Sequence, residues 1–96
     1  MPFKLSFTRE AASVLKKLEA DKDPKLKKVR KTLGLLEINP RHPGLATHEF
    51  TSLSGPAGEK VFEAYVENRT PGGWRFFWYY GPEAGMIRVL NIAAHS

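Results

Sequence analysis

The sequence predicts an α+β domain in which a helical hairpin packs on one face of a mostly antiparallel sheet. The N-terminal third begins with alternating apolar and polar residues and then changes to an apolar repeat of helical period. The C-terminal half consists of short aromatic and β-branched runs separated by turns that contain Gly and Pro. The predicted order is β-α-α-β-β-β. The 96 residues are near the usual size of one domain, so we expect a single domain over residues 1–96.

The first predicted elements are a strand and a helix. Residues 3–7 alternate apolar and polar side chains, as a half-buried strand does. Thr8 can cap the helix that follows, and Glu10 suits its first turn. The apolar face of this helix repeats at i, i+3, i+4 and i+7 and consists of Ala11, Val14, Leu15 and Leu18.

A second helix is predicted between two Pro-containing stops. We expect Asp23 to cap it, with Pro24 in the first helical position, and Asn39 with Pro40 to end it. Its apolar stripe consists of Leu26, Val29, Leu33 and Leu36. The basic residues project away from that stripe and are Lys25, Lys27, Lys28, Arg30 and Lys31. Together the two helices should form the antiparallel hairpin.

The remaining chain predicts a long loop and three strands. Residues 41–58 form the loop, which can contain a short strand near residues 47–51. The three strands cover residues 61–67, 74–80 and 86–93, and turns over residues 68–73 and 81–85 connect them.

The alternation of side chains assigns these strands a helix-facing side and an open side. We expect Phe62, Ala64 and Val66 to face the helices, and Glu63, Tyr65 and Glu67 to face away. On the next strand, the bulkier set suits the core and consists of Trp74, Phe76, Trp78 and Tyr80. Arg75 then lies on the open face beside Glu63 and Tyr65. The simplest interpretation is a cross-strand ion pair; the functional one is a site that binds an anion.

Composition excludes several classes of site. The chain has no cysteine, so it can form neither a disulfide framework nor a thiolate zinc site. Its apolar runs are too short to cross a bilayer, and its N-terminus does not resemble a signal peptide, so we expect a cytoplasmic protein without a membrane partner. No Gly-rich phosphate loop, nucleophile elbow or pair of His at helical spacing is present. We therefore expect no metal and no cofactor.

The positive charge is concentrated in the predicted helices. Residues 1–40 contain ten Lys or Arg against five Asp or Glu, whereas residues 41–96 contain five of each. Such a surface can attract a polyanion, meet an acidic protein, or simply be solvated. The candidate nucleic-acid contacts on the helices are Lys16, Lys17, Lys27, Lys28 and Lys31.

Four segments in succession resemble the RelE/ParE superfamily of bacterial toxins. They read NPRHPGL, GEKVFEAYV, WRFFWYY and IRVLNIAAH, and with the basic helical hairpin they extend the resemblance over nearly the whole chain. The resemblance implies a toxin that a cognate antitoxin neutralises. Many members cleave mRNA, often in the ribosomal A site, while others have lost nuclease chemistry and poison DNA gyrase.

The resemblance also implies roles for individual residues. Arg75 matches the arginine that contacts the scissile phosphate in the nucleases, and His95 falls where the YoeB-like branch has a C-terminal histidine of acid–base chemistry. Glu63 and Tyr65 stand where RelE has lysines, and Ser96 replaces a terminal tyrosine of the YoeB-like pattern.

The expected reaction is metal-independent cleavage of RNA by its own 2′-hydroxyl, which needs a base, an acid and positive charge on the phosphorane oxygens. Arg75 can supply the charge, His95 either proton transfer, Glu63 the base, and Tyr65 a stacking surface or a hydrogen-bond donor. His48 and Lys60 are candidates at the rim. One alternative is a non-catalytic ParE-like protein that binds gyrase. Another is a binding module that acts only with an antitoxin, for example on operator DNA, or a degenerate member without toxicity.

Overall fold

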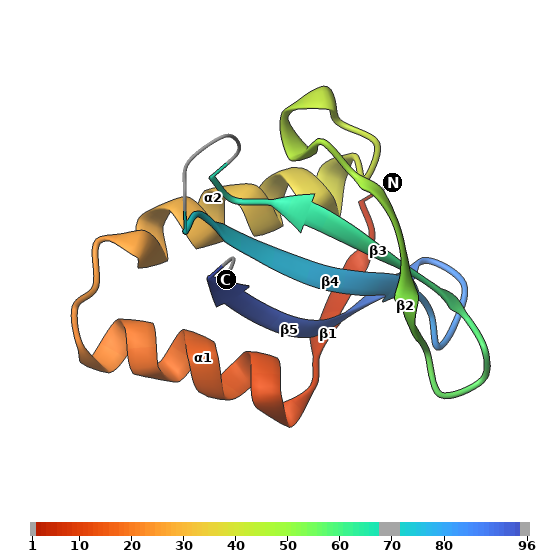
Figure 1. The fold of residues 1–96 in the computed structure, drawn as a ribbon, viewed down its shortest axis with the longest axis horizontal. Helices are drawn as coiled ribbons and strands as arrows, with labels where there is room; N and C mark the ends of the chain where they lie inside the picture. Colours follow the sequence, from red (N-terminus) through yellow and green to blue (C-terminus); the bar gives the residue numbers. More distant parts are fainter. Residues whose placement is uncertain (1, 68–71, 95–96) are drawn as a thin grey trace.

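The computed structural model describes residues 2–67 and 72–94 and confirms the predicted α+β class (Figure 1). The elements in chain order are β1 (Lys4–Phe7), α1 (Arg9–Ala20), α2 (Lys25–Ile38), the 3-10 turn η1 (Pro43–Leu45), β2 (His48–Ser54), β3 (Lys60–Tyr65), β4 (Trp74–Tyr80) and β5 (Met86–Ala94). The short strand expected near residues 47–51 is β2, a full member of the sheet. The order is therefore β-α-α-β-β-β-β.

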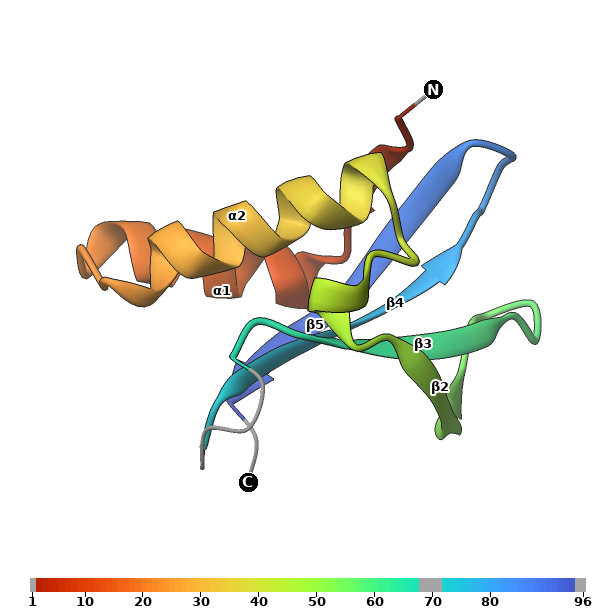
Figure 2. The same cartoon turned by 90° about the horizontal axis from the view of Figure 1, so that it is seen from above.

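In the described part of the chain, the strands form one sheet in the order β1-β5-β4-β3-β2. β1 pairs with β5 in parallel, and the other neighbours are antiparallel. The α1–α2 hairpin leads the chain from one edge of the sheet to the other, and the last three strands fill the space between. Both helices lie on the same face of the sheet (Figure 2), and they run in opposite directions (Figure 1). None of the described helices is long and apolar enough to cross a membrane.

Local capping explains where the helices begin. The Thr8 side chain accepts a hydrogen bond from the Ala11 amide at 3.2 Å, as predicted, and its hydroxyl also donates to the Leu90 carbonyl at 2.6 Å. Pro24 stands at the cap position of α2 and not in its first turn, so this prediction was wrong by one residue. The Asp23 carboxylate still accepts from the Lys25 amide at 2.9 Å, because a short side chain just before a helix reaches its free N–H groups.

The core confirms the predicted alternation of faces. Phe76 and Trp78 of β4 are buried against the helices, and Ala64 lies beside them, whereas Phe77 and Tyr79 are buried on the opposite face. Burying aromatic and aliphatic side chains on this scale stabilises the fold by about 1.5–3 kcal/mol each. The second cluster on the open face was not predicted. It forms because Phe50 of β2 covers Phe77, with 4.7 Å between the ring centroids.

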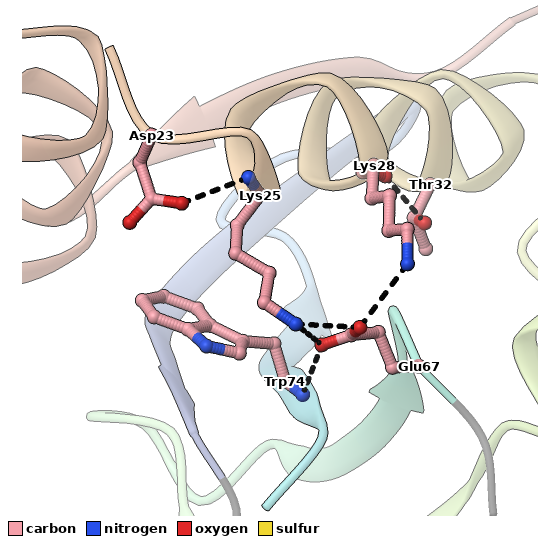
Figure 3. Close-up of polar contacts among 6 residues, drawn as sticks. All are labelled: Asp23, Lys25, Lys28, Thr32, Glu67 and Trp74. Carbon is pink, nitrogen blue, oxygen red and sulfur yellow. Dashed lines mark hydrogen bonds and ion pairs between the residues drawn. The ribbon is translucent and has the colours of Figure 1, made fainter. Parts of the chain in front are cut away.

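The prediction that Glu67 lies on the open face was wrong. Its carboxylate turns to the helix side and accepts from Lys25 Nζ at 2.6 Å, Lys28 Nζ at 3.3 Å and the Trp74 amide at 3.3 Å (Figure 3). β3 ends at Tyr65, and the amides of Val66 and Glu67 both donate to the Trp74 carbonyl, at 2.9 and 3.1 Å. Two residues opposite one interrupt the alternation of faces, as in a β-bulge.

This contact has electrostatic consequences at the start of α2. The hydrogen bond from the Lys25 ammonium is the largest cause that lowers the pKa of Glu67, and burial opposes it. With the smaller contributions of the Trp74 amide and Lys28, the pKa falls to about 2. The Glu67 side chain is only 7% exposed. Lys25 and Lys28, which were expected to project away from the apolar stripe of α2, thus tie α2 to the end of β3.

Candidate functional site

Four polar side chains meet on the open face of the sheet, around the carboxylate of Glu63. Arg75 Nη1 donates to Glu63 Oε2 at 2.5 Å, and the Tyr65 hydroxyl donates to Oε1 at 3.0 Å. His48 Nε2 lies 2.8 Å from the same Oε1. The Glu63 side chain is 3% exposed, so the three donors enclose it almost completely. We call this group the Glu63 cluster.

The register of three adjacent strands builds the Glu63 cluster. His48 of β2 stands directly opposite Glu63 of β3, and Tyr65 of β3 stands opposite Arg75 of β4. Directly opposed residues have their side chains on the same face, and so do residues two apart on one strand. The pairing of β2, β3 and β4 therefore brings all four side chains to one point, although they are far apart in the sequence.

The guanidinium of Arg75 is held by two kinds of contact. Besides its bond to Glu63, its Cζ lies 5.0 Å from the centroid of the Phe77 ring, a favourable cation–π distance. Its Nε is buried and has no hydrogen-bond partner among the described residues. The Arg75 side chain is 19% exposed. The residue is thus a fixed cation, part of which remains accessible from the open face.

Tyr65 and His48 complete the cluster as an aromatic pair, with 5.6 Å between their ring centroids. Burial raises the pKa of Tyr65 above 10.0, the hydrogen bond to Glu63 and the negative charge of Glu63 raise it further, and Arg75 opposes them. Tyr65 is therefore a neutral donor at physiological pH. His48 Nδ1 lies 3.3 Å from the Ala46 carbonyl, so a protonated ring would donate to both the carbonyl and Glu63.

The structure thus brings together three of the four residues expected to carry the chemistry: Arg75, Glu63 and Tyr65. The fourth, His95, lies outside the described residues. His48 was expected at the rim but belongs to the Glu63 cluster, and with 49% of its side chain exposed it is the most accessible member. The signal that could have found it is the pairing of β2 with β3.

Lys60 and the helix lysines lie elsewhere. Lys60 is three residues before Glu63 on β3, so the alternation of the strand places it on the helix-facing side. The five lysines proposed on the helices are exposed, although Lys17 pairs with Asp21 and Lys28 with Glu67. Because both helices cover the other face of the sheet (Figure 2), these lysines do not adjoin the Glu63 cluster.

A pocket of about 490 Å³ lies beside the cluster but is a different site. Its aromatic lining belongs to the helix-facing side of the sheet and consists of Phe62, Trp78 and Tyr80. Arg41 and His42 of the loop before β2 also line it, and so does His48. None of Glu63, Tyr65 and Arg75 lines it. Within residues 2–67 and 72–94, no group of three His, Asp or Glu side chains is arranged to hold a metal ion.

Comparison with solved structures finds the same fold in three proteins, each matched over almost the full length of both chains. A chain of the archaeal RelE–RelB complex from Pyrococcus horikoshii OT3 matches with a TM-score of 0.68 and 13% identity, over 98% of this chain and 96% of that one. A YoeB/ParE toxin from Agrobacterium tumefaciens matches with a TM-score of 0.70 and 12% identity, over 97% of this chain and 99% of that one. The YoeB dimer from Staphylococcus aureus matches with a TM-score of 0.63 and 12% identity, over the whole of both chains.

No protein-family model matches the sequence, and no curated protein matches it either. The likeness therefore consists of the fold. It confirms the RelE/ParE-like architecture expected from the sequence, a helical hairpin on a mostly antiparallel sheet.

Proposed function

We propose that this chain is a toxin of the RelE/ParE superfamily and that its Glu63 cluster is the site of a metal-independent endoribonuclease. The observation that carries the proposal is the burial of Glu63 beneath three donors, Arg75, Tyr65 and His48, all at 3.0 Å or less. A buried ion pair is weak evidence for stability, because desolvation offsets most of the attraction. A cation, an imidazole and a phenol converging on one carboxylate are instead typical of a site that transfers protons beside an anion.

The reaction that suits these groups is attack of a ribose 2′-hydroxyl on the adjacent phosphorus. It forms a 2′,3′-cyclic phosphate and releases a 5′-hydroxyl. The accessible part of Arg75 supplies positive charge to the phosphorane oxygens, and its planar guanidinium can bond two of them. Glu63 and Phe77 hold that guanidinium in place before substrate arrives, so little reorganisation is needed.

His48 and Glu63 together form the base in this proposal. Glu63 is too enclosed to meet a ribose hydroxyl directly, whereas His48 is about half exposed and bonded to it. In the neutral ring Nε2–H donates to Glu63, so Nδ1 accepts the 2′-hydroxyl proton, and the carboxylate stabilises the imidazolium that results. Tyr65 remains neutral and offers its ring to a neighbouring base. His95 is proposed as the acid that protonates the leaving 5′-oxygen.

We propose a cognate antitoxin as the protein partner, translated mRNA on the ribosome as the target, and the cytoplasm as the location. The fold supports the first of these, because a match of almost full length comes from a RelE–RelB complex. Co-expression of the reading frame next to the gene tests it: a small protein encoded there should restore growth and co-purify with this chain. Growth inhibition that no neighbouring product relieves would count against the pairing.

Cleavage of mRNA during translation, mapped at nucleotide resolution, tests the enzyme. We expect Arg75→Ala to lower the cleavage rate by about 100-fold or more, as the loss of a donor to a developing oxyanion does. His48→Gln and Glu63→Gln should each lower it by about 100-fold, the usual contribution of a proton-transfer group. Arg30→Ala, which breaks an exposed pair with Glu19 on the helix layer, is the matched control and should cleave normally. Undiminished cleavage in the three cluster variants would refute the site.

A non-catalytic, gyrase-binding toxin is the second candidate. The observation that favours it is the same short Arg75–Glu63 contact, because a guanidinium neutralised by a carboxylate has less charge to offer a phosphate. This alternative predicts inhibition of DNA supercoiling by purified protein, without RNA products. Cleavage products that disappear in Arg75→Ala would decide for the nuclease.

A further inference from the structure

A second arginine, Arg88 of β5, lies on the same face of the sheet as Arg75. Arg88 stands opposite Tyr79 of β4, and on its other side it stands opposite Ser6 of β1. Tyr79 belongs to the buried cluster of the open face together with Phe77. Because directly opposed residues share a face, the guanidinium of Arg88 is on the open side.

Arg88 differs from the other half-buried cations in having no acidic partner. Its Nη1 donates to the neutral hydroxyl of Ser6 at 3.3 Å. Arg75 has Glu63 and Lys25 has Glu67, but among the described residues no carboxylate lies within 4.0 Å of the Arg88 guanidinium. A partly buried cation without a counterion gains from an external anion, since it is already partly desolvated.

The surroundings strengthen the positive potential at this end of the face. Lys4 is exposed and lies two residues before Ser6 on β1, so it shares the open face with Arg88. Glu63 is the carboxylate of this face among the described strand residues, and it is occupied by Arg75, Tyr65 and His48. The Arg88 end of the face therefore carries positive charge that no strand carboxylate offsets.

Arg88 and Arg75 are directed to different parts of the open face, because Arg75 contacts Glu63 of β3 and Arg88 contacts Ser6 of β1, on opposite sides of the β5–β4 pair. Arg75 and Tyr79 are four residues apart on β4, a distance of about 13 Å at the rise of an extended strand. Arg88 lies opposite Tyr79, at the far end of that interval. The two arginines are thus separate cations along one continuous face, with Phe77 and its partner Asn91 between them.

We propose that Arg88, with Lys4 beside it, binds a second backbone phosphate of the single-stranded RNA whose scissile phosphate lies at Arg75. The inference rests on the proposed endoribonuclease function and specifies the path of the substrate across the sheet. The planar fork of Arg88 bonds two phosphate oxygens, and the Ser6 hydroxyl can support it from the side. Arg88 is a positioning residue: it determines how tightly RNA binds and does not touch the reacting atoms.

Binding of a fluorescently labelled 2′-O-methyl oligoribonucleotide tests this inference, because such RNA lacks the attacking hydroxyl and stays intact. Anisotropy titrations of the full chain over a range of salt concentrations give the affinity and its salt dependence. We expect Arg88→Ala to weaken binding by about 5–10-fold at low salt and to reduce the slope of log affinity against log salt by about 0.7, the value of one single-strand phosphate contact. Arg88→Lys should keep most of the slope, because the charge remains, and lose affinity by about 2–3-fold.

Arg9→Ala is the matched control, because it removes the same charge from the exposed start of α1 on the helix side. It should change the affinity by less than about 2-fold, as a charge far from the contact does in salt. Thermal unfolding of each variant shows that the fold is kept. The second phosphate site is refuted if Arg88→Ala weakens RNA binding no more than Arg9→Ala does, or if it leaves the salt slope unchanged. This holds even if Arg88→Ala weakens the binding of an acidic antitoxin.

Cleavage kinetics distinguish this inference from the proposed function. With cleavable RNA, Arg88→Ala should raise KM by about the factor seen in binding and leave kcat near the wild-type value. If the wild-type chain cleaves RNA and Arg88→Ala has the same KM as the wild type, the phosphate site at Arg88 is overturned and the nuclease function stands. A wild-type chain that binds RNA through Arg88 but never cleaves it overturns the nuclease and leaves the phosphate site standing.

Discussion

Glu63 and Arg75, twelve residues apart in the sequence, are joined by a 2.5 Å contact between Oε2 and Nη1 on the open face of the sheet. The pair is the centre of the candidate site, and it also crosses from β3 to β4. Its geometry therefore has consequences for stability as well as for activity.

The first prediction concerns the coupling of these two residues. In a double-mutant cycle of Glu63→Gln and Arg75→Gln, we expect a coupling free energy of about 1–3 kcal/mol, because either single change leaves a largely enclosed charge without its partner. Urea unfolding gives the four free energies. The control cycle is Glu19→Gln with Arg30→Gln, an exposed pair that should couple by less than about 0.5 kcal/mol. Additive effects at Glu63 and Arg75 would show that the pair is not a coupled unit.

The second prediction concerns the ionisation of Tyr65. Its pKa is raised above 10.0, first by burial and then by the hydrogen bond and charge of Glu63. In Glu63→Gln the pKa of Tyr65 should fall, because the negative charge of the carboxylate is removed while Arg75 remains. NMR titration of ring-labelled tyrosine measures it, and Glu59→Gln, in the loop between β2 and β3, should leave the value unchanged. A Tyr65 titration that is identical in Glu63→Gln would contradict the effect of the Glu63 charge on the phenol.

The same shift sets an alkaline limit on stability. The folded chain holds the Tyr65 proton more tightly than the unfolded chain does. The resulting stabilisation is fully present below about pH 10 and is lost as the pH rises through the folded-state pKa.

The third prediction concerns Glu67 and acid. The pKa of Glu67 is lowered from 4.5 to about 2 in the folded chain. The contacts of the Glu67 carboxylate therefore stabilise the fold above pH 4.5, and this stabilisation is lost as the pH falls toward 2. The full shift would correspond to about 3 kcal/mol, and solvent screening at the partly exposed lysines reduces it to about 1–2 kcal/mol.

Glu67→Gln should therefore destabilise the protein by about 1–2 kcal/mol at pH 7 and by much less at pH 2, because protonated Glu67 resembles Gln. Urea unfolding at the two pH values measures this difference. The control is Glu37→Gln, which changes an exposed carboxylate near the end of α2. It should change the free energy of unfolding by less than about 0.5 kcal/mol at either pH. An equal loss at both pH values would exclude ionic stabilisation by Glu67.

The fourth prediction concerns Thr8, whose hydroxyl caps α1 and also donates to the Leu90 carbonyl of β5. Thr8→Ala removes both bonds and should cost about 1–2 kcal/mol, at the upper end for a helix cap. Thr8→Ser keeps the hydroxyl and should recover most of the loss. Thermal unfolding compares the three proteins, and equal melting of the Ala and Ser variants would mean that the hydroxyl contributes nothing.

Local patterns in the sequence were enough to predict much of the fold. The helices follow from apolar residues three and four apart, and Thr8 as a cap follows from its place before them. The faces of β4 follow from strict alternation, which puts Trp78 in the core and Arg75 on the open side. These features depend on side chains close together in the chain, so they can be inferred without the partner strands.

Other features depend on which strands pair and where the pairing is interrupted. His48 joins the site only because β2 lies beside β3 with His48 opposite Glu63, and its own loop-like sequence does not specify that register. Glu67 leaves the open face because two amides share one carbonyl at the end of β3. Arg88 lies between Ser6 of β1 and Tyr79 of β4 only because the sheet order places β5 between β1 and β4.

The sequence by itself thus determined the class of the fold and the presence of Arg75 on an aromatic strand, because both follow from the spacing of apolar and polar residues along the chain. The tertiary structure decided which groups Arg75 meets, that His48 and not Glu63 is the exposed member of the cluster, and that a second arginine shares its face. The physical reason is that a site assembled across strands depends on register, and register is set by long-range pairing and bulges.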